Sequence, residues 1–426
     1  MGLLKTVTQA WKVPEMRRKI LFTLAMLVVF RIGSNIPVPG INRDYLARIF
    51  SGETGLFDLF DLFSGGAFQK FTIFALSITP YITASIIVQL LTVAFPYFEN
   101  LAKEGTAGRK KMAQITRYMT IGLGLIQSVG LTVGLFRGAV INQTVFSFAV
   151  IILVLTAGTA FLMWLGEEIN DKGVGNGISL LIFAGIVARI PTGIRTMVVK
   201  YQEGSVNVVT LVLFALFALV VIAGIIMVQQ GTRKIPVQYA KRVVGRKMYG
   251  GQATHIPLKV NQAGVIPVIF AMALLTFPLT ITYFFPNTDF TAFVTKYLSP
   301  GGMPGAWIYG ALNVVLIIAF TYFYTAITFN PIEIASNMRA NGGFIPGIRP
   351  GRATVDYLHR VMTRLSLVGA IFLAIVATLP LLLSQVSGID VRFGGTSLLI
   401  AIGVALDTMR QLEDQMVMRN YRGFLK

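Results

Sequence analysis

The chain of 426 residues contains no cysteine and only two histidines. The absence of cysteine excludes disulfide bonds, thiol nucleophiles and cysteine-ligated metals. None of the 15 lysines follows a glycine, which excludes the Gly-Lys-Ser/Thr step of a Walker A nucleotide site. His255 and His359 are too far apart in the sequence for an HExxH zinc motif. We therefore expect no catalytic residue, no metal site and no cofactor, and a protein that is not an enzyme.

Charged residues are also scarce, at 13% of the chain against about a quarter in soluble domains. Hydrophobic residues make up 54%, and the mean hydropathy is +0.70. The few charges are strongly biased, because 37 Lys and Arg stand against 18 Asp and Glu. A membrane protein is indicated, with basic residues that fix its orientation or contact nucleic acid or anionic lipid.

Long apolar segments account for most of the chain, and about 20 such residues are needed to cross a bilayer. The first follows Met16-Arg17-Arg18-Lys19 and resembles a signal peptide, but no small-residue cleavage site follows it, so we expect a retained span. We predict ten spans: 20–36, 71–95, 114–136, 147–166, 177–194, 206–228, 263–285, 306–329, 362–383 and 395–411.

An even number of spans places both termini on one side of the membrane. Most Lys and Arg residues fall on that side, so the positive-inside rule predicts that both termini are cytoplasmic. Within the spans, Arg31 is expected to reach the outer face, and Asp407 lies near the cytoplasmic end of the tenth span. We find no proton pathway or nucleotide site, so an outside partner must power any work.

An apolar segment between the first two spans is too short to cross. Asp58 and Asp61 are three residues apart, which places both on one face of a short helix, and Gly65-Gly66 ends it as a hinge. Such a helix either lies flat on the outer surface or folds back into a cavity within the protein.

Two cytoplasmic loops carry unusual basic patterns. Residues 229–262 contain no acid, and their paired cations suit phosphates or an acidic protein, although topogenic charge and anionic lipid explain them equally well. In the loop 330–361, Arg349 stands alone on a Gly/Pro-rich turn that suits insertion into a partner. The candidate partner-binding residues are Arg233, Lys234, Lys241, Arg242, Arg246, Lys247 and Arg349.

Over essentially its whole length the chain resembles the SecY family, the pore-forming subunits of the bacterial general secretory (Sec) translocon. The matching stretches are Phe30-Arg31-Ile32-Gly33, Phe63-Ser64-Gly65-Gly66-Ala67, Thr79-Pro80-Tyr81-Ile82, Gly175-Asn176-Gly177-Ile178-Ser179, Tyr239-Ala240-Lys241-Arg242, His255-Ile256-Pro257-Leu258-Lys259-Val260-Asn261, Phe329-Asn330-Pro331, Pro346-Gly347-Ile348-Arg349-Pro350-Gly351 and Phe393-Gly394-Gly395-Thr396-Ser397.

The resemblance implies an all-α polytopic membrane protein with ten transmembrane helices in two inverted five-helix halves around a central pore. The halves are residues 1–200 (spans one to five, with a re-entrant plug helix at about 57–67) and 201–426 (spans six to ten, with cytoplasmic loops at about 229–262 and 330–361). It implies location in the bacterial cytoplasmic membrane. The implied partners are SecE, SecG, the SecA ATPase, the ribosome, an unfolded preprotein with its signal sequence, and membrane lipids.

The resemblance also assigns roles to residues. The plug comprises Phe57, Asp58, Leu59, Phe60, Asp61, Leu62, Phe63, Ser64, Gly65, Gly66 and Ala67. The pore ring falls on Ile78, Ile82, Ile178, Ile182, Ile269 and Ile400. Polar residues of a sideways gate to lipid fall on Thr83, Gln127 and Asn261. By spacing alone, only Ile78/Ile82 and Ile178/Ile182 are predicted to share a helix face.

The implied function is a passive protein-conducting channel for secretory proteins that also releases apolar segments into lipid. An ion-coupled secondary transporter is the first alternative, and it would need paired membrane carboxylates. A lipid-dependent membrane enzyme is the second, and it would need a nucleophile and a base in the spans.

Overall fold

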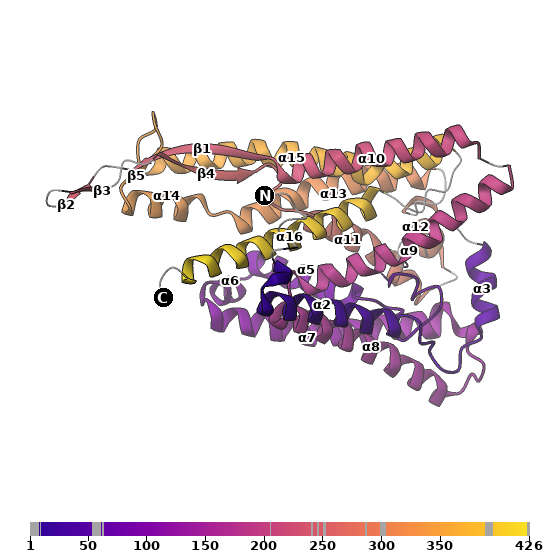
Figure 1. The fold of residues 1–426 in the computed structure, drawn as a ribbon. Helices are drawn as coiled ribbons and strands as arrows, with labels where there is room; N and C mark the ends of the chain where they lie inside the picture. Colours follow the sequence, from indigo (N-terminus) through magenta and orange to yellow (C-terminus); the bar gives the residue numbers. More distant parts are fainter. Residues whose placement is uncertain are drawn as a thin grey trace.

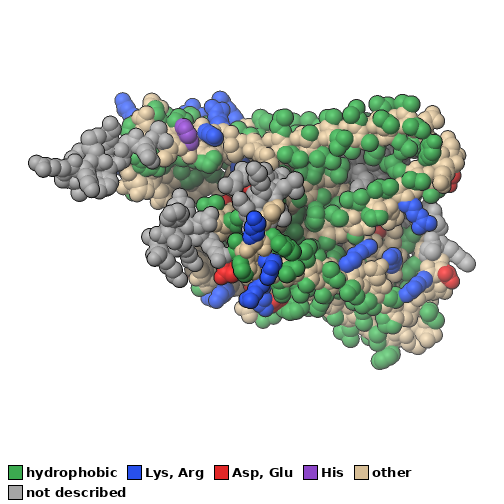
Figure 2. Space-filling view, in the orientation of Figure 1, with side chains coloured by type: hydrophobic (Ala, Val, Ile, Leu, Met, Phe, Trp, Pro, Cys, Tyr) green, Lys and Arg blue, Asp and Glu red, His purple; other side chains and the backbone are tan. Residues whose placement is uncertain are grey.

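The computed structural model describes residues 8, 10–52, 61, 64–204, 206–239, 242–244, 247–249, 253–285, 288–298, 304–387 and 395–423. They form an elongated bundle of helices with a β-structured extension at one end (Figure 1). Large hydrophobic side chains cover much of the outside of the bundle (Figure 2), including Val209, Leu213, Leu216 and Val220 of one helix. Apolar surface on this scale indicates a protein surrounded by lipid.

A helix overlaps each of the ten predicted spans. They are α2 (Pro14–Gly33), α5 (Thr79–Ala94), α7 (Thr106–Val129), α8 (Val145–Lys172), α9 (Gly177–Gln202), α10 (Val208–Gln230), α11 (Ile266–Thr282), α13 (Gly305–Thr328), α15 (Arg352–Ser387) and α16 (Gly395–Gly423). Within the described residues, six helices are by themselves long and apolar enough to cross a membrane. A seventh span results if α5 is joined to α6 (Pro96–Lys103), which is bent from it by 101°.

The second span differs from its prediction. Residues 71–95 were expected to be helical throughout, but α5 begins at Thr79 and residues 65–78 form turns. Phe71 and Ser77 have positive φ values of 46° and 53°, which a right-handed helix does not allow. The segment before Thr79 is therefore apolar but not helical, which is why composition alone predicted too early a start for this helix.

The basic loop 229–262 is not simply a loop. Strands β1 (Thr232–Tyr239) and β4 (Ala253–Lys259) form an antiparallel hairpin in which Ile235 pairs with Ile256. The short strand β5 (Gly343–Phe344) adds to the other edge of β1, and β2 (Arg242–Val244) pairs with β3 (Lys247–Tyr249). Ile235 and Val237 are buried on one face of β1, in alternation with exposed residues. This period-two pattern was the overlooked sequence signal.

The remaining elements divide between the two ends of the bundle. Helix α14 (Pro331–Ala340), α6 and the C-terminal part of α16 lie at the same end as the hairpin, whereas α3 (Arg43–Gly52) and α12 (Asp289–Tyr297) lie at the other (Figure 1). Helix α7 continues into the π-helical turn η1 (Gly130–Leu135) and the 3-10 turn η2 (Arg137–Ala139).

Helix packing joins neighbours along the chain and then closes the bundle. Helices α5, α7, α8 and α9 pack in sequence order, as do α11, α13, α15 and α16. Two further contacts, α5 with α11 and α9 with α16, bring the first set against the second. The residues at these two crossings form the largest hydrophobic cluster.

Close packing of α8 on α9 depends on glycine. A Cβ atom at Gly177 would lie 2.0 Å from the carbonyl oxygen of Gly166, so the two backbones touch there. Because a backbone carbonyl cannot move aside, we expect Gly177→Ala to lower the free energy of unfolding by about 1–3 kcal/mol. Thermal unfolding in detergent measures this. The control is Gly122→Ala, in α7, where a Cβ meets no atom within 4 Å. Equal melting temperatures for the two variants would contradict the prediction.

Candidate functional site

Six isoleucines, on four helices or at the N-cap of one of them, belong to the same hydrophobic cluster, which is the largest in the described residues. They come from the N-terminal ends of α5 and α9, from α11 and from α16, and each is at most 9% exposed: Ile78, Ile82, Ile178, Ile182, Ile269 and Ile400. The structure thus places all six residues in one cluster, including the two that sequence spacing did not connect, and their role as a pore ring stays a prediction. Their branched side chains offer no hydrogen-bonding group, so the cluster presents an apolar wall.

Local capping sets the position of the isoleucines on α9. The Asn176 side chain accepts a hydrogen bond from the Ser179 backbone N–H at 3.1 Å, which caps the first turn of the helix. The Asn170 side chain at the end of α8 accepts another from the Gly177 N–H at 2.7 Å. Both bonds satisfy backbone N–H groups in the first turn of α9, the turn that carries Ile178.

The segment proposed as a plug is described in part. Phe57, Asp58, Leu59, Phe60, Leu62 and Phe63 lie outside the described residues. Asp61, Ser64 and Ala67 are buried, and Ala67 belongs to the same cluster as the six isoleucines. Gly65 has φ +63°, and a Cβ atom there would lie 2.7 Å from the Gly185 Cα on α9. These residues therefore pack inside the bundle, as the re-entrant alternative predicts, and not flat on its outer surface.

Two arginines in the spans contact this segment, and the sequence interpretation missed both contacts. Arg31 was expected to reach the outer face, but its Nη1 donates a hydrogen bond to the Gly65 carbonyl at 2.9 Å. Arg189 lies within the predicted span 177–194 but was not singled out, and its Nη2 lies 3.2 Å from Asp61 Oδ2. A charge inside an apolar span was the available signal for both.

The three polar residues proposed for a sideways gate do not form one network. Thr83 on α5 donates to the Thr79 carbonyl of its own helix at 3.1 Å, and Gln127 is buried on α7. Asn261 lies before α11, where its Nδ2 donates to the Gly264 carbonyl at 2.9 Å. In the part of the chain that the structure describes, no hydrogen bond joins any two of these three side chains.

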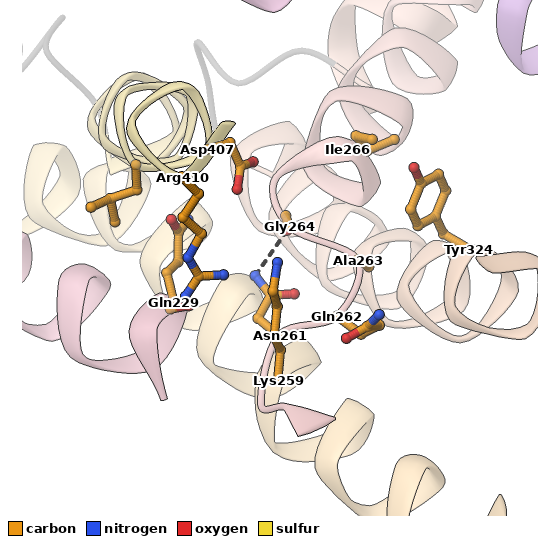
Figure 3. A pocket seen from close by; sticks show the side chains of 11 residues that line it. Gln229, Lys259, Asn261, Gln262, Ala263, Gly264, Ile266, Tyr324, Asp407 and Arg410 are labelled. Carbon is orange, nitrogen blue, oxygen red and sulfur yellow. Dashed lines mark hydrogen bonds between the residues drawn. The ribbon is translucent and has the colours of Figure 1, made fainter. Parts of the chain in front are cut away.

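Asn261 instead lines a polar pocket of about 180 Å³ (Figure 3). Asp407 and Arg410 of α16 approach it from one side and Tyr324 of α13 from the other (Figure 3). Asp407 is not at a helix end, because α16 continues to Gly423. Arg410 Nη2 donates to the Gln229 carbonyl at 3.3 Å, so the pocket joins α10 and α16 to the base of the hairpin.

Five of the seven basic residues proposed to bind partners are described, and they lie in or next to the strands β1, β2, β3 and β5. Arg233 and Lys234 are exposed on β1, Arg242 lies in β2 and Lys247 in β3, whereas Lys241 and Arg246 lie outside the described residues.

Arg349 stands on a turn fixed at both ends. The turn follows β5, and Gly347 and Gly351 have φ values of +80° and +109°, which non-glycine residues rarely adopt. The Thr354 hydroxyl donates to the Arg349 carbonyl at 3.0 Å, while the residue itself is exposed. The structure therefore holds the backbone of Arg349 and presents its guanidinium to solvent.

Comparison with known proteins gives a consistent result. A model of the SecY family matches residues 72–409. The chain is 51% identical to the protein translocase subunit SecY of Halalkalibacterium halodurans and 49% identical to that of Bacillus subtilis, in each case over 100% of both chains. A solved structure described as "The structure of a protein conducting channel" covers 94% of the chain at 21% identity, with a TM-score of 0.69 and 93% of its own length matched. This likeness shows that the chain shares the fold of that channel structure.

Proposed function

This chain belongs to the SecY family, and we propose that it is the pore through which unfolded secretory proteins cross the bacterial cytoplasmic membrane. The observation that carries the proposal is the meeting of six buried isoleucines from four helices, drawn from both ends of the sequence. A ring of branched aliphatic side chains closes around a threading chain and excludes hydrated ions. Such a ring also does not bind the translocating polypeptide at particular sequences, because it offers no fixed hydrogen-bond partner.

The channel is passive in this proposal, and its partners do the work. SecE and SecG assemble with it, and the SecA ATPase or the ribosome binds the hairpin end, where Arg233, Lys234 and Arg349 are exposed. That end is cytoplasmic in this proposal, with both termini on the same side, because most Lys and Arg residues of the sequence fall in the segments on that side. Residues 1–200 and 201–426 form the two halves, and the contact of α5 with α11 lies at the opening to lipid. Thr83, Gln127 and Asn261 are the proposed polar residues of this sideways gate.

A secondary transporter is the other candidate for a fold with inverted halves. Coupling to ions requires carboxylates placed together inside the spans. Among the described residues, Asp61 and Asp407 are the buried or pocket-lining carboxylates found within the bundle, and they lie in different sites, one beside Arg189 and the other beside Arg410. No observation favours this candidate over the channel.

Reconstituted vesicles test the proposal. The complex with SecE and SecG is expected to protect a preprotein from external protease only when SecA and ATP are both supplied, because the channel has no energy source of its own. Vesicles with the complex but with a non-hydrolysable nucleotide are the control. Protection without ATP, or no protection with every component present, would contradict the proposed function.

A further inference from the structure

We propose that α12 is an interfacial anchor, a short amphipathic helix that lies at the boundary between lipid headgroups and acyl chains, at the end of the bundle opposite the hairpin. Its partner is the bilayer itself, which the exposed aromatic side chains of the helix enter. The inference goes beyond the proposed function and does not depend on it, because it concerns how this end of the protein meets the membrane.

The residues of α12 are divided between two faces. Phe290, Phe293 and Tyr297 follow one another at spacings of three and four, so they share one side of the helix. Thr291 and Thr295 lie on the opposite side, where a helix that rests on an apolar medium keeps its polar groups. With nine residues the helix is too short to cross a bilayer, so this division suits only a helix that lies on the membrane.

Contacts with the protein hold the helix but leave its aromatic side chains uncovered. Val294 is buried at 1% exposure, and α12 packs on both α11 and α13. The Thr288 hydroxyl accepts a hydrogen bond from the Thr291 backbone N–H at 3.4 Å, which caps the first turn. In contrast, Phe290 is 43% exposed and Phe293 is 55% exposed. The helix therefore has a fixed position, with its phenylalanines turned away from the bundle.

The exposed aromatic surface continues on both neighbours of α12 in the chain. Phe285, three residues after the end of α11, is 55% exposed, and Trp307, in the first turn of α13, is 56% exposed. Since α11 and α13 overlap predicted spans, these ends mark the edge of the membrane, where aromatic residues concentrate. The lipid-covered surface of the bundle therefore extends onto α12.

The order of chemical groups along the helix matches this depth. The rings of Phe293 and Tyr297 lie 5.0 Å apart, and Lys296 Nζ lies 5.3 Å from the centre of the Tyr297 ring. The series passes from an apolar ring to a ring with a hydroxyl and then to a cation. Acyl chains suit the first of these groups, and the hydrated headgroups suit the other two.

Single nitroxide labels test the depth of the helix, and the absence of cysteine from the chain makes such labelling direct. The labelled positions are Phe293→Cys, Thr295→Cys on the opposite face, and Val315→Cys, an exposed position within α13. Complexes with SecE and SecG subunits that lack cysteine are reconstituted in vesicles of phosphatidylethanolamine and phosphatidylglycerol. Spin relaxation is measured with oxygen, which concentrates among acyl chains, and with a water-soluble nickel chelate on both sides of the membrane.

We expect oxygen to relax the label at position 293 more than nickel does, as at position 315, and the reverse at position 295. Addition of Phe290→Ser to Phe293→Cys should lower the ratio of oxygen to nickel relaxation at least about twofold, because the binding strength of an interfacial helix scales with its buried apolar area. Addition of Thr295→Ala instead is the matched control and should leave the ratio unchanged.

Three results would overturn the anchor. Stronger relaxation by nickel at position 293 would place the aromatic face in water, and weak relaxation by both reagents there would show that a protein covers it. An unchanged ratio with Phe290→Ser would show that the aromatic side chains do not set the depth of the helix. The measurement uses no preprotein, SecA or ATP, so each of these results leaves the proposed function untouched.

Discussion

Replacing Ile82, Ile182 and Ile269 together by glycine is expected to raise the ion conductance of the channel during translocation at least about tenfold. The three side chains come from different helices and belong to one buried hydrophobic cluster, so their loss leaves a gap in the apolar packing between α5, α9 and α11. A fall of only about 1.4 kcal/mol in the barrier to an ion gives a tenfold change in flux. Lysine at the same positions should instead lower the stability of the closed channel by several kcal/mol per residue, because each substitution buries a charge where water is excluded.

Single-channel recording with an arrested preprotein in the pore measures this effect. The matched control carries three glycines at exposed isoleucines of other helix faces, Ile121, Ile194 and Ile375. The control has the same loss of helix propensity, about 1 kcal/mol per residue. If the two triple variants conduct equally, the buried isoleucines do not form the seal.

Replacing Arg349 by lysine is expected to reduce SecA-driven translocation about tenfold or more while assembly and topology are unchanged. The backbone of Arg349 is fixed between two glycines with positive φ, so its guanidinium reaches a partner in one geometry. A guanidinium makes two parallel hydrogen bonds to a carboxylate, which an ammonium does not reproduce. The loss of one charge-assisted hydrogen bond is worth about 1.5–3 kcal/mol.

The control for this variant is Arg352→Lys, three residues further on, where the arginine is also exposed. Charge reversal at Lys234 on β1 should be milder and should weaken further with added salt, because exposed charges act diffusely. The readout is protease protection of a preprotein in vesicles that contain equal amounts of each variant. Full activity of Arg349→Lys would show that this position needs only a positive charge.

Most of the fold could be predicted because hydrophobicity is a local property. A helix overlaps each of the ten predicted spans, and the fold class was confirmed. The start of α5 was wrong by eight residues because the turn at 65–78 is as apolar as the helix that follows. The β1–β4 hairpin was not predicted, although Ile235 and Val237 alternate with exposed neighbours in β1.

The site was predictable only in part, and largely through family resemblance. Ile78/Ile82 and Ile178/Ile182 follow from helical spacing, but no spacing connects them with Ile269 or Ile400. The grouping of Thr83, Gln127 and Asn261 stays a prediction, since Thr83 donates its hydrogen bond to the Thr79 carbonyl and Asn261 to the Gly264 carbonyl.

The sequence by itself determined that this is a membrane protein, where its helices lie and which end carries the positive charge. These properties depend on the composition of short segments, because about 20 apolar residues suffice to cross the membrane and the Lys and Arg residues of the loops set the orientation. Only the tertiary structure decided which isoleucines meet, and that Arg31 and Arg189 turn inward to Gly65 and Asp61. The partners in each of these contacts are separated by tens or hundreds of residues, and their distance is set by how whole helices pack. Charge and apolarity in the sequence restrict such contacts, but the packing of α2, α5, α9, α11 and α16 selects them.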